Sequence, residues 1–331
     1  MKLTTVAKAL AATAAAGLAY AHQETHWFEV KHVSVPLLAR GQRDIRLLHL
    51  TDLHFLPSQV DKARWLASLV ELAPDAIVDT GDNISSAASV PALLDVFRAS
   101  GLLSIPGVFV GGSNDYYAPV LKNPANYLKR HRVIPEHLPP LPWQDLFAGF
   151  EAGGWISLNN ARANLRLPDG RVIDFVGTDD AHHGRDVFPP RQASGQARPG
   201  SVKTRAKQAG AGARARASFN AQPPVVNIGV THAPYQATLK RFRDDGVSLV
   251  MAGHTHGGQL RVPGFGALVT NCDLDRHRAE GLHGWPGARP NTPMGKGSIW
   301  LYVSAGVGTS PYAPFRFACR PSATLLTLTA A

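Results

Sequence analysis

Aspartate, histidine and asparagine follow five short apolar stretches of the chain, and these residue types bind metal ions. Asp52 and His54 are one position apart, and an extended segment would point both side chains to the same side. His254 and His256 have the same spacing and are flanked by glycines. Carboxylate, imidazole and amide ligands together suit divalent Mn, Fe and Zn. The candidate metal ligands are Asp52, His54, Asp82, Asn114, His232, His254 and His256.

This set of ligands is large enough for two metal ions. Two divalent ions about 3.5–4 Å apart need a bridging carboxylate and several terminal ligands. Asp82 directly follows Gly81, and a glycine permits close approach of the backbone. We therefore expect a pair of divalent ions as cofactors, with Mn, Fe and Zn as the candidates.

Apolar stretches with the length of buried strands precede these polar residues. In an open α/β sheet the carboxyl ends of the strands line the ligand crevice, so loops far apart in sequence meet there. Strands that alternate with helices imply an α/β fold, and the closely spaced later strands imply an added antiparallel portion. We expect helices at 61–72, 91–98 and 237–243, and strands at 32–37, 45–50, 76–78, 108–110, 155–158, 163–167, 172–176, 225–230, 249–252, 298–304 and 323–329.

The formal net charge of +10 is concentrated in one stretch of the 331-residue chain. Residues 191–220 hold seven Lys or Arg and no Asp or Glu, which leaves the remainder near +3. This local charge argues against a nucleic-acid partner for the folded body. Residues 193–222 offer almost nothing to bury, and we expect a disordered basic surface insertion there. A tolerated linker is the simpler interpretation, and a tether to anionic surfaces is the alternative.

Residues 1–30 form an Ala-rich N-terminal segment ahead of the main domain, residues 31–331. Two lysines followed by a short apolar run that ends Ala19-Tyr20-Ala21 match the pattern of an export signal. Alanine also forms ordinary helices readily, and a secure transmembrane helix needs about 20 apolar residues. A plain helix, a weak anchor with peripheral membrane contact and an export signal are the alternatives. The protein is accordingly expected to be cytoplasmic, membrane-associated or exported.

The ordered polar blocks resemble the motifs of calcineurin-like metallophosphoesterases. Four of the five blocks match in order and spacing, over roughly residues 45–305. The residues that follow His256 are similar to those of small bacterial phosphohydrolases acting on envelope-type substrates. The blocks are Asp52-x-His54, Gly81-Asp82, Gly112-Ser113-Asn114-Asp115, the isolated His232 and Gly253-His254-x-His256, with Gly257-Gly258-Gln259 after it.

The resemblance implies an α/β fold in which two β-sheets form a sandwich flanked by helices. It implies an enzyme that hydrolyses a phosphate ester, either a monoester or a diester, with water activated between two metal ions. The substrate would be a small or lipid-linked phosphate ester. In the implied ligand set, Asp52, His54 and His256 hold one ion, His232 and His254 hold the other, and Asp82 bridges them.

One block departs from the family pattern, which usually reads Gly-Asn-His-Asp with Asn as a ligand and His near the scissile oxygen. A gapless match puts Ser113 at the ligand position and Asn114 where the histidine belongs. Serine is a poor neutral ligand, so we favour a small loop shift that makes Asn114 the ligand, with Ser113 as the alternative. Asp115 would support catalysis by orienting the ligands.

The missing histidine calls for a substitute, because a proton donor to the leaving oxygen contributes about 10²–10⁴-fold to the rate. Residues 179–185 follow a predicted strand and contain His182, His183 and Arg185. We expect His182 to be the catalytic donor, with His183 as the alternative, and Arg185 to hold the phosphate in a bidentate contact. The same residues would also suit an ordinary surface loop.

Two other functions stay open from the sequence alone. A nuclease of the same chemical class would use the basic insertion to hold a phosphate backbone. A non-catalytic metal-binding scaffold would keep both ions and hydrolyse nothing, because of the altered block. The sequence carries no signature of an oligomeric state.

Overall fold

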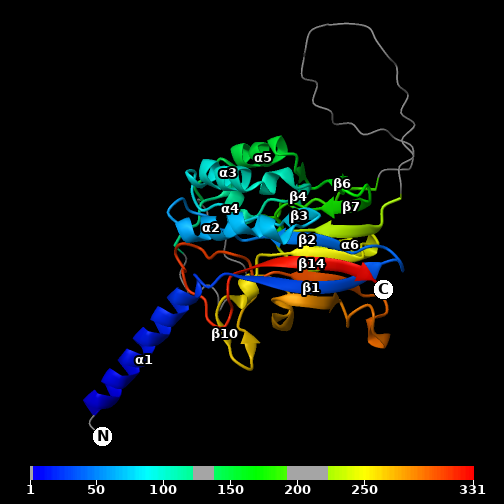
Figure 1. Cartoon of the computed structure of the whole chain (residues 1–331). Helices are drawn as coiled ribbons and strands as arrows, with labels where there is room; N and C mark the ends of the chain where they lie inside the picture. The colour runs from blue at the N-terminus through cyan, green and yellow to red at the C-terminus, as the bar shows by residue number, and fades with distance from the viewer. Residues whose placement is uncertain (1–2, 122–137, 192–222) are drawn as a thin grey trace, which may run out of the picture.

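The computed structural model describes residues 3–121, 138–191 and 223–331, and the expected basic insertion at 193–222 lies outside them. Within the described residues, two six-stranded sheets face each other (Figure 1). The first sheet has the order β1-β14-β2-β3-β4-β5 and the second β12-β13-β9-β8-β7-β6. A separate two-stranded hairpin, β10–β11, leaves the body at one end.

The strands that precede the predicted ligands run in the same direction within each sheet. In the first sheet, β2, β3, β4 and β5 are parallel, whereas β14 is antiparallel to β2. The strands of this sheet are β1 (Glu29–Leu38), β14 (Ser322–Ala330), β2 (Ile45–Leu50), β3 (Ala76–Asp79), β4 (Gly107–Phe109) and β5 (Ile156–Ser157).

In the second sheet, β7, β8, β9 and β13 are parallel and the edge strands β6 and β12 are antiparallel to their neighbours. The expected antiparallel portion is therefore present. The strands are β12 (Gly281–Trp285), β13 (Ile299–Val303), β9 (Leu249–Ala252), β8 (Val226–Val230), β7 (Val172–Gly177) and β6 (Arg162–Arg166), and the hairpin consists of β10 (Arg261–Val262) and β11 (Gly266–Ala267).

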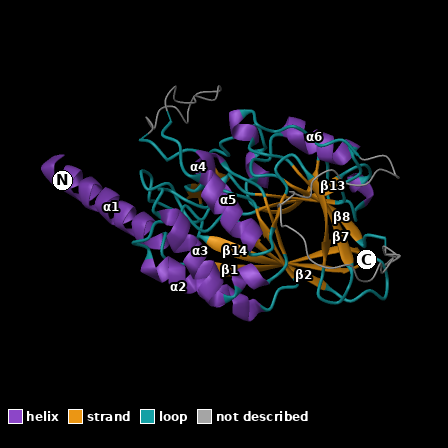
Figure 2. Ribbon diagram, turned by 90° about the horizontal axis from the view of Figure 1, so that it is seen from above, coloured by secondary structure: helices purple, strands orange, loops and turns teal. Residues whose placement is uncertain are grey.

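Helices cover the outer faces of both sheets, with α2, α3 and α5 on one side and α6 on the other (Figure 2). Helix α3 has a proline in its first turn and ends at Gly101, whose φ of +84° closes the helix. The helices are α1 (Leu3–Glu24), α2 (Val60–Ser68), α3 (Ser89–Ser100), α4 (Ser113–Tyr116), α5 (Trp143–Ala152) and α6 (Gln236–Asp244).

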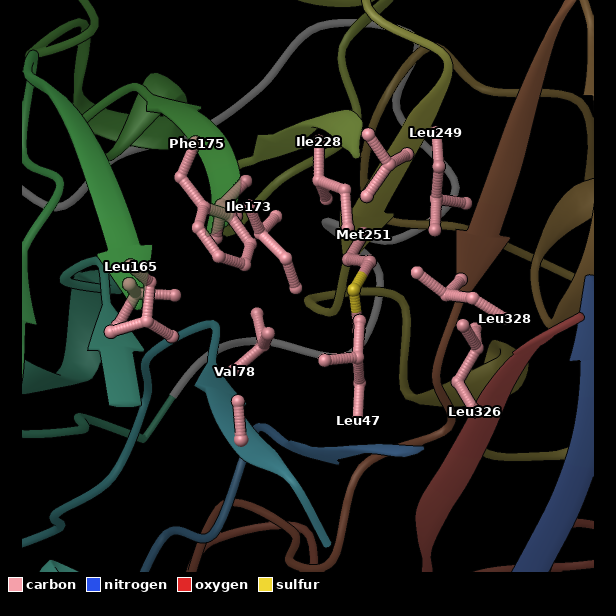
Figure 3. Packing of buried hydrophobic residues seen from close by; sticks show 14 of the residues in the cluster. Leu47, Val78, Leu165, Ile173, Phe175, Ile228, Leu249, Met251, Leu326 and Leu328 are labelled. Carbon is pink, nitrogen blue, oxygen red and sulfur yellow. The ribbon is translucent and has the colours of Figure 1, made fainter. Parts of the chain in front are cut away.

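The main hydrophobic core lies between the two sheets (Figure 3). Leu47, Val78 and Leu326 of the first sheet face Phe175 and Met251 of the second, and all five are fully buried. Complete burial of such a side chain contributes about 1.5–3 kcal/mol. A second cluster joins the outer face of the first sheet to α2, α3 and α5, so this sheet is buried on both faces. That double burial explains why β2 (IRLLHL) has apolar residues at four of its six positions instead of a strict apolar–polar alternation.

The N-terminal segment is helical, because α1 extends from residue 3 to residue 24 and projects from the body in both views (Figures 1 and 2). Among the described residues, no helix combines the length and apolar character needed to cross a membrane.

The expected two-sheet sandwich of α/β class flanked by helices is confirmed. Helices α4 and α5, the β10–β11 hairpin and strand β12 were not anticipated. Helix α5 contains aromatic residues and an internal glycine that hide its period, and β12 is a five-residue strand with glycines at two positions. The expected helix at 61–72 is shorter, since α2 ends at Ser68 and a 3₁₀ turn continues to Leu72. The two cysteines are free thiols.

Candidate metal centre

The loops at the carboxyl ends of β2, β3 and β9 bend sharply through left-handed residues. Positive φ is uncommon outside glycine and concentrates at functional sites, where each such residue costs on the order of 1–3 kcal/mol. The extended Asp-x-His segment expected from the sequence is therefore wrong in its backbone conformation. The left-handed residues in these loops are Asp52 (φ 48°), His54 (φ 41°), Asp82 (φ 58°), His254 (φ 69°) and His256 (φ 50°).

Hydrogen bonds between the loops stabilise these conformations. The backbone N–H of Asp52 donates to the carbonyl of Gly81 at 2.8 Å, and that of His54 donates to the carbonyl of Asp82 at 2.9 Å. The N–H of His254 donates to Oδ2 of Asp52 at 2.9 Å. The first loop is thus tied to a neighbour in its own sheet and to a loop of the opposite sheet.

One cluster of ligand atoms consists of Asp52, His54 and His256, whose atoms all lie within 4.8 Å of one another. Nε2 of His54 is 3.3 Å from Nε2 of His256, and the two rings are stacked. Nε2 of His256 is 3.5 Å from Oδ1 of Asp52. These are the three residues expected to share one ion.

A second cluster contains Asp82 and His232, together with Asp52, again within 4.8 Å. Nε2 of His232 is 3.5 Å from Oδ2 of Asp82, and Nδ1 of His254 is 3.3 Å from Nε2 of His232. The same Oδ2 of Asp82 is also 3.5 Å from Nε2 of His54 in the first cluster. One carboxylate oxygen of Asp82 therefore lies between an imidazole of each cluster.

Three of the imidazoles each donate one ring N–H to a backbone carbonyl, a group that accepts hydrogen bonds and cannot donate them. Nδ1 of His232 donates to the carbonyl of Thr80 at 2.8 Å, and Nδ1 of His256 donates to that of Gly308 at 3.1 Å. Nε2 of His254 donates to the carbonyl of Asn271 at 3.2 Å. In each ring the other nitrogen points into the cluster, which is the arrangement that metal-binding histidines adopt.

The unpaired groups in the clusters fit divalent cations. Burial lowers the pKa of His54 to about 4, of His254 to about 4 and of His256 to about 3, so these rings are neutral at pH 7. Nε2 of His54 and Nε2 of His256 face each other at 3.3 Å, which places two imidazole ligands side by side for one cation. Oδ1 of Asp52 is buried without a hydrogen-bond partner among the described residues. Each of these atoms is a suitable ligand for a divalent metal ion.

The electrostatic interaction between Asp82 and His232 keeps the Asp82 carboxylate negatively charged, which favours a cation beside it. Burial acts to raise the pKa of Asp82, but the nearby His232 outweighs it and holds that pKa well below its usual value. Burial acts to lower the pKa of His232, but the carboxylate of Asp82 raises it well above its usual value. Asp82 is therefore ionised, which is the form that binds a metal ion.

Asp115 connects the loop after β3 with the loop after β4. Its carboxylate accepts the backbone N–H groups of Asp82 at 2.9 Å, Asn83 at 2.7 Å and Gly112 at 2.9 Å. The backbone N–H of Asn114 donates to Oδ1 of Asp82 at 2.6 Å, and its side-chain amide donates to the carbonyl of Tyr117 at 3.1 Å. Asp115 thus lies behind Asp82, in the position expected of a residue that orients it.

The loop after β7 reaches the same site through Asp180, which is fully buried. Its Oδ2 accepts the hydroxyl of Ser113 at 2.8 Å and pairs with Nδ1 of His183 at 2.7 Å. Its Oδ1 accepts the backbone N–H of His182 at 2.8 Å. The ring of His182 lies 4.8 Å from that of His254, centroid to centroid. The loop is therefore attached to the altered block, and it brings a histidine to the metal centre.

Arg185 is oriented toward a different feature. Its Nε donates to Asp179 at 3.1 Å, and its guanidinium lies 3.8 Å from the centroid of the Tyr116 ring. It lines a cavity of about 360 Å³ together with Trp143 and Phe147. The structure does not group it with the clustered ligand atoms.

Two buried cations beside the site were not anticipated. Arg316 is fully buried, and its Nη2 donates to the carbonyl of Gly308, the group that also accepts from His256. Lys62 donates to the carbonyl of Leu53 at 2.9 Å, and burial lowers its pKa to about 7. Lys62 and Arg316 both lie outside the polar blocks in the sequence. Only the folded structure shows that they are near the site.

The facing sheets and the buried carboxylate–imidazole clusters at their strand ends define a metal-binding protein of mixed α/β class. A family model described as calcineurin-like phosphoesterase matches residues 45–258, from the start of β2 to the turn after His256. The chain belongs to this family, and it is a metal-dependent phosphoester hydrolase.

Relatives match almost the whole chain. YkuE of Bacillus subtilis (strain 168), an uncharacterized metallophosphoesterase, is 25% identical over 330 residues, which cover 96% of this chain and 92% of the relative. The phosphodiesterase YaeI of Escherichia coli (strain K12) is 27% identical over 330 residues, 97% of each chain. Among solved structures, the protein TT1561 of Thermus thermophilus covers 80% of this chain and 91% of its own at 10% identity, with a TM-score of 0.39.

Replacing Gly112 with alanine tests how tightly the site is built. A Cβ at this position would lie 2.4 Å from both N and Oδ1 of Asp82 and 2.9 Å from Cε1 of His232. The φ of −107° suits any residue, so the effect is purely steric. We expect Gly112→Ala to weaken Mn²⁺ binding by about 10–100-fold in calorimetric titration, because Asp82 must move. Gly17→Ala, with no atom within 4 Å of its Cβ, is the control. Unchanged affinity in Gly112→Ala would contradict this geometry.

Proposed function

We propose that the protein holds two divalent metal ions and hydrolyses a phosphate ester with water as the nucleophile. The observation that supports two ions is the position of Asp82. Its Oδ2 is 3.5 Å from Nε2 of His54 in one cluster and 3.5 Å from Nε2 of His232 in the other. Two ions about 3.5–4 Å apart share such a carboxylate.

Each ion has its own set of terminal ligands in this proposal. We infer that Asn114 rather than Ser113 completes the second set, because the Ser113 hydroxyl is bonded to Asp180, whereas the bond of Asn114 to Tyr117 uses its amide nitrogen and not its side-chain oxygen. Mn, Fe and Zn all suit a mixed set of carboxylate, imidazole and amide ligands. The first set is Asp52, His54 and His256, the second is His232, His254 and Asn114, and Asp82 belongs to both.

Bound in these positions, divalent ions supply positive charge that polarises a phosphoryl oxygen and lowers the pKa of the attacking water. The residues of the chain keep this arrangement rigid. The carboxylate of Asp115 accepts the backbone N–H groups of Asp82 and its neighbour Asn83 and that of Gly112 in the next loop. The hydrogen bonds of His232 and His256 to backbone carbonyls hold the rings so that the other nitrogen of each points into the site. The site therefore needs little rearrangement during the reaction.

We assign the proton donor for the leaving oxygen to His182. Its ring packs against His254 at the edge of the site, and its Nδ1 lies 3.0 Å from the hydroxyl of Tyr235. His183 is the weaker candidate, because its Nδ1 is paired with Asp180 and its ring lies against Tyr117. Asp180 acts as a positioning residue that holds the loop carrying His182 against the block containing Ser113.

The substrate is a phosphate ester, and we favour a diester. The relative from Escherichia coli is named a phosphodiesterase, and it matches this chain along its whole length. Arg185 lines the cavity beside Tyr116 rather than the ligand clusters, which supports contact with the part of a small or lipid-linked substrate that lies beyond the reacting phosphate.

Removal of the shared carboxylate tests the two-ion proposal. Asp82→Ala should lower the metal content from two Mn per chain and reduce hydrolysis of bis(p-nitrophenyl) phosphate at least about 100-fold, because both ions lose a ligand. Metal content is measured by mass spectrometry after reloading the metal-stripped protein. Asp95→Ala, at an exposed carboxylate of α3, is the control. Wild-type protein that binds two ions and turns over no ester with any metal would instead be a metal-binding scaffold.

Comparing esters with poor and good leaving groups tests the role of His182. His182→Gln should slow hydrolysis of an alkyl phosphodiester by about 10²–10⁴-fold and that of a dinitrophenyl ester only slightly, because a good leaving group needs no proton. Metal content should not change. Asp180→Asn should show the same selectivity, and the double variant should be no slower than His182→Gln alone. Equal losses on both esters, or additive effects in the double variant, would contradict these roles.

A further inference from the structure

Large apolar side chains are exposed on three adjacent segments at one end of the molecule: helix α1, the β10–β11 hairpin and the chain around 312–317. Their exposed fractions lie between 36% and 67%. Groups of exposed large apolar side chains that lie next to one another mark interaction sites on soluble proteins. We call this surface the apolar face, and its residues are Leu10, Leu18, Tyr20, Leu260, Val262, Phe265, Leu268, Tyr312 and Phe317.

The three segments are joined to one another. Leu260 forms a β-bridge with Phe317, and the ring of Phe317 meets that of Tyr20 edge to face at 5.5 Å. The carboxylate of Glu24, at the end of α1, accepts the backbone N–H groups of Ala318 and Cys319 at 3.0 and 2.7 Å. Figure 1 shows α1 and the hairpin leaving the body toward the same side. The apolar face is therefore one surface with a fixed base.

Positive charge borders the apolar face. The guanidinium of Arg276 lies over the ring of Phe265 at 4.8 Å, and that of Arg320 lies over Trp27 at 5.5 Å. Neither has a carboxylate partner among the residues that the structure describes. Residues 260–270 contain no Asp or Glu. Aromatic and aliphatic groups beside unpaired arginines are the composition that binds the interface of an anionic bilayer.

The shape of the face favours a lipid surface over a second copy of the chain. Residues 10–20 of α1 are exposed on every side of the helix, so no side of this segment packs against the body. The inner side of the hairpin borders an open hollow of about 930 Å³ that separates much of it from residues 274–277. An interface of lipid headgroups and acyl chains can surround both elements.

We propose that the apolar face docks onto an anionic lipid bilayer and that the metal centre acts on a phosphate ester carried by that bilayer. The second part rests on the proposed function. His256 begins the turn that leads directly to Leu260 and β10, and a Cβ on Gly258 would lie 2.4 Å from Ala267 of β11. One rim of the site is therefore continuous with the hairpin, and docking brings that rim to the headgroup layer.

Vesicle co-sedimentation of the full chain tests the docking. Wild type should bind vesicles of phosphatidylcholine with about 30% phosphatidylglycerol at least about tenfold more tightly than phosphatidylcholine alone, because Arg276 and Arg320 meet anionic headgroups. The double variant Val262→Asp/Phe265→Asp should lose at least tenfold of this binding. Val187→Asp/Met294→Asp places the same charges at exposed apolar positions outside the face and should bind like wild type.

The hairpin variant should hydrolyse soluble bis(p-nitrophenyl) phosphate at the wild-type rate and a phosphodiester embedded in vesicles at least tenfold more slowly. Retained activity on the soluble ester separates a failure of docking from a failure of the proposed function. Equal vesicle binding by wild type and hairpin variant would overturn the proposal. A dimer that the variant abolishes in sedimentation velocity, without vesicle binding by wild type, would assign the face to a second copy of the chain.

Discussion

The contact on which the site depends is that of one carboxylate oxygen of Asp82 with two imidazole nitrogens from different loops, His54 and His232, each at 3.5 Å. All three groups are buried. In this interior an uncompensated negative charge on Asp82 would be costly, and a cation beside it is therefore bound strongly. Most surrounding contacts serve to keep this oxygen in place. Asp115 fixes the backbone around Asp82, and the carbonyl of Thr80 fixes the ring of His232.

This arrangement requires a strained backbone. Five of the candidate ligand residues have positive φ, and the sandwich stabilises them because its two sheets end at the same place and tie the loops to one another. Close approach also requires glycine at chosen points. A Cβ on Gly253 would lie 2.0 Å from the hydroxyl of Thr51, and one on Gly306 would lie 2.5 Å from Cβ of Asp52. The two-sheet core supplies the rigidity that permits this strain.

The sequence predicted the strands that carry the ligands, with β2 and β9 at their observed bounds, because apolar runs followed by polar blocks are a local signal. The six carboxylate and imidazole residues of the ligand set lie together in space, although their roles as ligands stay predictions. Helix α5, the bond between Ser113 and Asp180 and the burial of Arg316 were not predictable, because each depends on contacts between distant parts of the chain. The contacts of Arg185 with Asp179 and Tyr116 were not predictable for the same reason, and its role in binding phosphate stays a prediction.

The most direct test of the two-ion centre is a crystal structure of the Mn-loaded protein with anomalous data collected near the Mn edge. We expect two anomalous peaks about 3.5–4 Å apart, with Oδ2 of Asp82 between them. Asp52, His54 and His256 should lie at one peak, and His232 and His254 at the other. A single peak, or two peaks of which neither contacts Asp82, would contradict it.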